Sequence, residues 1–78
     1  MKIKDMAPNT KGKVTGFSSS DRAYRQKLLR MGLIKGTEFT VIRKAPLGDP
    51  VEIQLEGFNL TLRKKEAEAV DVEPVGEE

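Results

Sequence analysis

The sequence contains neither cysteine nor histidine, and these two absences exclude much of the chemistry that small proteins use. Without cysteine the chain has no disulfides and no thiolate metal sites. Without histidine it lacks the commonest protein ligand for zinc and iron, and also the usual general base of enzymes. Carboxylates are the only charged metal ligands left, and they suit hard cations rather than ferrous iron.

Long apolar runs are also absent. The first six residues do not form the apolar stretch of a signal peptide, and no later window approaches the ~18 apolar residues of a membrane span. We therefore expect a soluble, cytoplasmic protein. The 78 residues suffice for one small domain, which we place at residues 1–73. A domain of this size buries only about 60% of its unfolded surface, so its core is modest.

Charge is unevenly distributed along the chain. All fourteen lysines and arginines lie in residues 1–65 with six acids, whereas residues 66–78 contain six acids and no base. Such a basic body suits an acidic partner surface, an anionic membrane or nucleic acid. The alternative is a solvated surface whose charge serves solubility. Residues 74–78 are expected to form a disordered acidic tail.

The segment Ala45–Pro50 separates two strand-like runs. The run before it is rich in β-branched residues, and the run after it alternates apolar and polar residues. Two prolines, a glycine and an aspartate between such runs predict a hairpin with a long, stiffened loop. Within it Gly48 suits a positive φ and Asp49 suits a turn cap, whereas the hairpin itself does not need Leu47.

A helix is predicted from Asp21 to Met31. Ser18–Ser20 supply N-cap candidates, and Gly32 followed by Leu33 is typical of a C-terminal Schellman cap. One side of this helix carries an apolar stripe of Tyr24, Leu28 and Met31. The other positions carry the basic residues Arg22, Arg25, Lys27 and Arg30, with Leu29 among them.

Five short strands are predicted, one before this helix and four after it: Lys11–Phe17, Thr37–Lys44, Val51–Glu56, Asn59–Lys64 and Val70–Val72. One helical turn is predicted at 65–69. A type II′ turn at Gly57-Phe58 would pair Leu55 with Leu60, Ile53 with Leu62 and Glu52 with Arg63. Strands this short need closure or a second layer to bury their apolar face. We therefore expect a mainly β protein, a small SH3-like barrel of about five strands with one helix inserted after the first.

Three groups of residues together resemble the FeoA family. They are Leu28–Leu33 followed by Gly36, then Ala45–Val51, and finally Leu60–Lys64 followed by Glu66-Ala67 and Val70–Val72. The resemblance implies an SH3-like fold and a role as a cytoplasmic accessory protein of ferrous iron transport. It also implies a partner, the FeoB-type membrane transporter with its cytoplasmic GTP-binding domain, through which this chain would reach the membrane.

No enzymatic site is expected. The serines at 18–20 have no histidine or evident lysine partner to activate them, and the glycines form no phosphate-binding loop. The sequence therefore predicts neither catalytic residues nor a cofactor. The acids Glu66, Glu68, Asp71 and Glu73 would offer at best a weak, exposed site for a hard cation, so we expect no metal site.

Partner binding remains the best-supported kind of function. The candidate contact residues are Leu47, Gly48, Asp49 and Pro50 in the loop and Arg22, Arg25, Lys27, Leu29 and Arg30 on the helix. A nucleic-acid-binding module and an iron sensor are the rival hypotheses. The first lacks the exposed aromatic residues that stack on bases, because the three phenylalanines have core or turn roles and Tyr24 lies on the buried stripe. The oligomeric state is left open, since small barrels can pair through edge strands.

Overall fold

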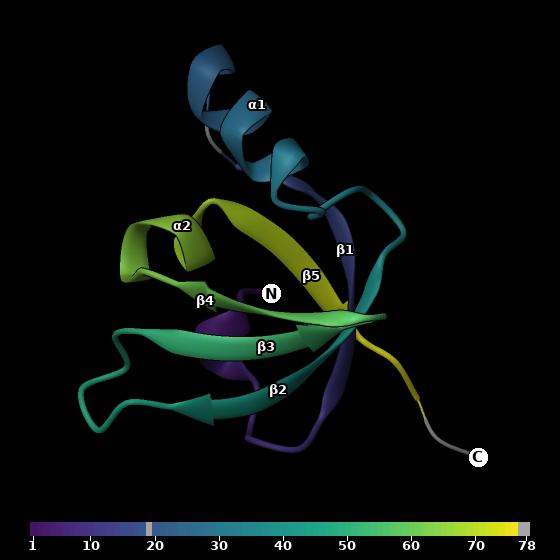
Figure 1. Ribbon diagram of the computed structural model, residues 1–78, viewed down its shortest axis with the longest axis vertical. Helices are drawn as coiled ribbons and strands as arrows, with labels where there is room; N and C mark the ends of the chain where they lie inside the picture. The colour runs from purple at the N-terminus through teal and green to yellow at the C-terminus, as the bar shows by residue number, and fades with distance from the viewer. Residues whose placement is uncertain (19, 77–78) are drawn as a thin grey trace.

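Five β-strands, two α-helices and one 3₁₀ turn make up the computed structural model, which describes residues 1–18 and 20–76 (Figure 1). In chain order the elements are η1 (Ile3–Asp5), β1 (Lys11–Phe17), α1 (Arg22–Arg30), β2 (Glu38–Lys44), β3 (Val51–Leu55), β4 (Phe58–Leu62), α2 (Lys64–Glu68) and β5 (Val70–Pro74). The predicted order of strands, with one helix after the first of them, is therefore confirmed.

The strands form one antiparallel sheet in the order β4-β3-β2-β1-β5. Figure 1 shows β1 and β5 turned steeply relative to β2, β3 and β4, so that the sheet curves around the core. Within residues 1–18 and 20–76, β4 and β5 do not pair with each other, so the sheet is not closed as a barrel would be. The outer edge of β5 is partly covered, because Val72 N donates to the carbonyl of Met1 over 2.9 Å.

The core lies inside this curved sheet and follows the alternation read from the sequence. Val51, Ile53 and Leu55 of β3 are buried while the residues between them are not, and Phe39 and Val41 of β2 are buried in the same way. This is the period of two that a strand with one covered face requires. Leu28 of α1 and Leu33 after it are fully buried, and together with Ile3 and Met6 near the N-terminus they complete the same core.

Local signals determine both ends of α1. The sequence predicts a serine at the N-cap, but the structure places Asp21 there, with its carboxylate accepting from the backbone N–H groups of Ala23 and Tyr24 at 3.0 and 3.3 Å. Of the serine candidates, Ser18 and Ser20 lie before the cap, and Ser19 lies outside the described residues.

The C-terminal end of α1 is the predicted Schellman cap. Gly32 has a φ of +101° and donates to the carbonyl of Leu29 at 3.0 Å, and Leu33 donates to the carbonyl of Leu28 at 3.2 Å. The two hydrogen bonds satisfy carbonyls that the helix end would leave without partners. They also turn the chain so that Leu33 enters the core.

The pairing of β3 with β4 differs from the prediction by two residues. Leu55 pairs with Phe58 and Ile53 with Leu60, so the turn residues are Glu56 and Gly57 rather than Gly57 and Phe58. A shift of two keeps every side chain on its predicted face, because the side-chain period of a strand is also two. It does change the partners: Glu52 lies opposite Thr61, and its carboxylate pairs with Arg43 on β2 at 3.2 Å instead of with Arg63.

The chain stays paired through residue 75. β5 ends at Pro74, and Val75 N donates to the carbonyl of Lys11 over 3.0 Å. The predicted tail of residues 74–78 thus begins inside a paired region, while Glu77 and Glu78 lie outside the described residues.

Candidate functional site

The β2–β3 loop holds Leu47 at its tip. Two backbone hydrogen bonds close the loop, from Gly48 N to the carbonyl of Ala45 at 2.8 Å and from Ala45 N to the carbonyl of Pro50 at 3.0 Å. Gly48 has the positive φ expected of it, +81°. The Leu47 side chain is 93% exposed, the largest value among the exposed large apolar residues of the described chain. A fixed loop thus presents a leucine that makes no contribution to the core.

Asp49 ties the same loop to the following helix. Its carboxylate accepts a 3.0 Å hydrogen bond from the backbone N–H of Lys64, the first residue of α2. A carboxylate at this position satisfies one of the donors that a helix start leaves free. The sequence predicts that Asp49 caps its own turn, whereas the structure shows it capping α2, which is distant in sequence. The loop cannot leave α2 without breaking this bond.

A cavity of about 230 Å³ lies beneath the loop. Lysines and apolar side chains line it, among them Lys2, Lys4, Leu47, Val51, Lys64 and Ala67. Lys44 lies nearby and donates to the carbonyl of Lys4 at 2.8 Å, which joins β2 to η1. The loop therefore covers a small cavity, and a hydrogen bond holds one of the lining residues, Lys4, to β2.

The helix residues named by the sequence divide into two groups. Arg22, Arg25 and Arg30 are exposed, and no ion pair involves them within the described part of the chain. Lys27 differs, because its ammonium lies 3.0 Å from a carboxylate oxygen of Glu66 and 5.7 Å from the ring centre of Tyr24. Lys27 therefore joins α1 to α2 and does not belong to the free basic face, whereas Leu29 is half-buried beside the arginines.

Glu66 is the buried acid of this contact. Its second carboxylate oxygen accepts from the backbone N–H of Arg63 at 2.9 Å. Burial alone would raise the pKa of Glu66, but the hydrogen bonds from Arg63 and Lys27 outweigh it, and the net pKa is lowered. Burial and the nearby Glu66 charge raise the pKa of Tyr24. Glu66 thus stays ionised and anchors α1 on α2.

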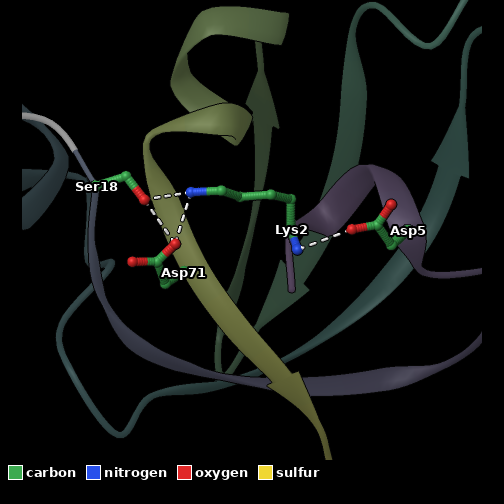
Figure 2. Close-up of polar contacts among 4 residues, drawn as sticks. All are labelled: Lys2, Asp5, Ser18 and Asp71. Carbon is green, nitrogen blue, oxygen red and sulfur yellow. Dashed lines mark hydrogen bonds and ion pairs between the residues drawn. The ribbon is translucent and has the colours of Figure 1, made fainter.

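A polar cluster near the N-terminus was not foreseen (Figure 2). The Lys2 ammonium lies between the Ser18 hydroxyl and the Asp71 carboxylate, 2.6 Å from the latter, and the Ser18 hydroxyl donates to the same carboxylate oxygen at 2.6 Å. A lysine therefore contacts Ser18, although the sequence did not indicate this contact. No local pattern could have revealed the cluster, because its members lie at 2, 18 and 71.

This cluster is structural in character. Hydrogen bonds from Lys2 and then Ser18 lower the pKa of Asp71, so its carboxylate is ionised. Lys2 donates to the Ser18 hydroxyl and does not accept from it, so the geometry does not present Lys2 as a base for Ser18. The contact instead fastens the N-terminus to the end of β1 and to β5.

The acids near the C-terminus do not gather. Glu66, Asp71 and Glu73 each pair with a different lysine, the last with Lys13 at 3.5 Å. Across residues 1–18 and 20–76 no three acidic side chains come together as metal ligands would. The same stretches contain no helix long and apolar enough to cross a membrane.

The two candidate surfaces lie on either side of α2. Figure 1 shows α1 at the top of the molecule and the β2–β3 loop at its lower left, with α2 between them. α2 contacts both of them, because Glu66 pairs with Lys27 of α1 and the backbone N–H of Lys64 donates to Asp49 of the loop. Each has to be tested separately.

Comparison with known proteins agrees with this architecture. A model of the FeoA domain matches residues 1–74. Over 50 residues, or 64% of the chain, the sequence is 38% identical to the Fe(2+) transport protein A/Fe(2+) transporter FeoB fusion protein of Porphyromonas gingivalis, of which this match spans 6%.

Solved structures show the same likeness. The FeoA-like protein of Clostridium acetobutylicum has a TM-score of 0.85 at 36% identity, covering 100% of this chain and 90% of that one. The FeoA of Stenotrophomonas maltophilia, an SH3 domain protein solved with zinc, has a TM-score of 0.78 at 26% identity, covering 94% and 89%. With the family model spanning nearly the whole chain, the protein belongs to the FeoA family of non-catalytic accessory proteins of ferrous iron transport.

Proposed function

We propose that this protein docks on a FeoB-type ferrous iron transporter at the cytoplasmic face of the membrane and modulates its GTP cycle or its assembly. The observation that carries the proposal is the Porphyromonas gingivalis fusion protein, in which a region similar to this chain shares one polypeptide with FeoB. Joining two domains in one chain raises their effective concentration for each other, which favours domains that make contact.

Leu47 is the contact residue that we favour. Its side chain is 93% exposed, and complete burial of a leucine contributes about 1.5–3 kcal/mol. The loop is already fixed by its own hydrogen bonds and by Asp49 on α2, so docking would order little additional chain. Gly48, Asp49 and Pro50 would then position Leu47, and their own side chains would contribute less to binding.

The test is a chemical-shift titration of the labelled protein with the transporter. The GTP-binding domain is added first, in its GDP and GTP states, and the full-length transporter in lipid nanodiscs second. We expect shifts in residues 45–50, and we expect Leu47→Ala to weaken binding about 10- to 100-fold, which corresponds to the burial energy of a leucine.

Ile34→Ala is the matched control, because Ile34 is also an exposed apolar residue at 54% but lies outside the loop. Equal weakening by both variants would show that Leu47 has no special role. Absence of any shift with the full-length transporter in both nucleotide states would refute the proposal. GTP hydrolysis followed with and without the protein then gives the sign of the effect.

A further inference from the structure

The outer face of α1 carries a row of three arginines. Arg22, Arg25 and Arg30 stand at positions i, i+3 and i+8, and such positions share one face of a helix. At 1.5 Å per residue the row is about 12 Å long. All three side chains are exposed, and within residues 1–18 and 20–76 none of them has an ion-pair partner.

The groups around this row leave its charge largely uncompensated. Residues 21–36 contain five basic residues and one acid. That acid, Asp21, is the N-cap, and its carboxylate accepts from two backbone N–H groups. Lys27 is turned toward α2 and is neutralised by Glu66, while Lys35 beyond the helix is exposed. This end of the molecule is therefore strongly cationic.

α1 forms one end of the molecule, and none of its arginines lines a described cavity. Figure 1 shows α1 at one end of the fold, above α2 and β5 in this view. The cavities of about 570, 420, 320 and 230 Å³ are lined by other residues than these three arginines. A specific acidic side chain would be recognised in a pocket with fixed geometry, whereas an exposed row of cations fits a flat surface of negative charge.

We propose that the outer face of α1 docks on an anionic phospholipid membrane. The phosphates of the lipid headgroups would pair with Arg22, Arg25 and Arg30. Leu29 between them is half-buried, so the contact is electrostatic and peripheral and involves no insertion of the helix. The β2–β3 loop lies on the other side of α2 from α1 and does not form part of this face, so this inference does not depend on the proposed function.

The experiment is co-sedimentation of the intact protein with vesicles. One set contains phosphatidylglycerol and phosphatidylcholine in equal parts, and the other contains phosphatidylcholine alone. We expect binding only to the anionic set, and a loss of binding between 0.05 and 0.5 M salt as the charges are screened. Each arginine contributes about five-fold to partitioning, so R22Q/R25Q/R30Q is expected to bind about 100-fold more weakly.

The matched control removes the same charge elsewhere. Lys4, Lys11 and Lys64 are exposed and have no ion-pair partner in the part of the chain that the structure describes. K4Q/K11Q/K64Q should lose less than ten-fold, with circular dichroism confirming that both triple variants are folded. Leu47→Ala should bind vesicles like the unchanged protein, which separates this result from the test of the loop.

Two results would overturn the proposal. The first is no binding of the unchanged protein to anionic vesicles at low salt. The second is an equal loss in both triple variants, because net charge and not the α1 face would then be responsible. If the first result is accompanied by shifts at α1 on adding the transporter's soluble domain, the face is assigned to a protein partner.

Discussion

Replacing Gly32 by alanine tests whether the cap of α1 depends on a left-handed backbone. Gly32 has a φ of +101°, where residues with a Cβ are strained. The left-handed conformation costs such residues about 1–2 kcal/mol. The new Cβ would also lie 3.0 Å from Cζ of Phe58, the far end of a side chain that is 47% exposed and has room to move.

The expected loss is therefore about 1–2 kcal/mol from the backbone, with a few tenths more from Phe58. In a domain of this size each kcal/mol lowers Tm by roughly 4–8 °C. Two other glycines separate the contributions. Gly36 has a φ of +95° and nothing within 4 Å of an added Cβ, so Gly36→Ala shows the backbone cost alone.

Gly16 has no positive φ, and nothing lies within 4 Å of its added Cβ, so Gly16→Ala should be neutral or stabilising by up to about 1 kcal/mol. The assay is urea unfolding of the three variants, followed by circular dichroism. If Gly36→Ala unfolds at the same urea concentration as the unchanged protein, backbone strain is not the cause. If Gly16→Ala is as unstable as Gly32→Ala, the reasoning fails as a whole. In a Phe58→Ala background the difference in stability between Gly32→Ala and Gly36→Ala should vanish.

Three further predictions concern the core and the charges. Leu28→Ala should lower the free energy of unfolding by about 2–5 kcal/mol, because Leu28 is fully buried; thermal unfolding measures it. Asp71 has a lowered pKa in the folded protein, so its stabilisation is complete above its ordinary pKa of 3.8 and is lost as the pH falls below it. Urea unfolding from pH 6 to 3 should therefore show a steeper loss in the unchanged protein than in Asp71→Asn. Arg43 and Glu52 should couple by about 0.2–1 kcal/mol in a double-mutant cycle, whereas Arg63 and Glu52 should not couple.

Each of these has a contradicting outcome. A Leu28→Ala protein with unchanged thermal stability would mean that α1 is not packed on the core. If stability falls equally with pH in the unchanged protein and in Asp71→Asn, the ion pair of Asp71 does not form in the folded protein in solution. Coupling between Arg63 and Glu52 would favour the strand register predicted from the sequence over the one in the structure.

The helix could be predicted because its signals are local. Gly32 and Leu33 directly follow the last turn, and the stripe containing Leu28 has the helical period. The β3–β4 register could not be fixed in the same way. Both registers place Ile53 and Leu55 on the core face, so the apolar pattern does not distinguish them, and only the position of Gly57 within the turn does.

The candidate site shows the same limit. The exposure of Leu47 could be predicted, because the other residues of the loop have structural roles that are evident from the sequence and Leu47 has none. The ion pair that separates Lys27 from the basic face could not be predicted, because its partner Glu66 is near Lys27 only in the folded chain. Contacts between residues distant in sequence carry no local pattern, so Lys2 and Asp71 could not be paired in advance.

The hydrogen bond between Asp49 and the amide of Lys64 makes that amide a spectroscopic sensor of the loop. Its exchange with solvent requires the loop to lift from α2, so its exchange rate measures how often the loop opens. A ligand that holds Leu47 in place should slow this exchange, and a ligand that pulls the loop away should speed it. One backbone N–H outside the loop would therefore report both the occupancy and the direction of loop movement.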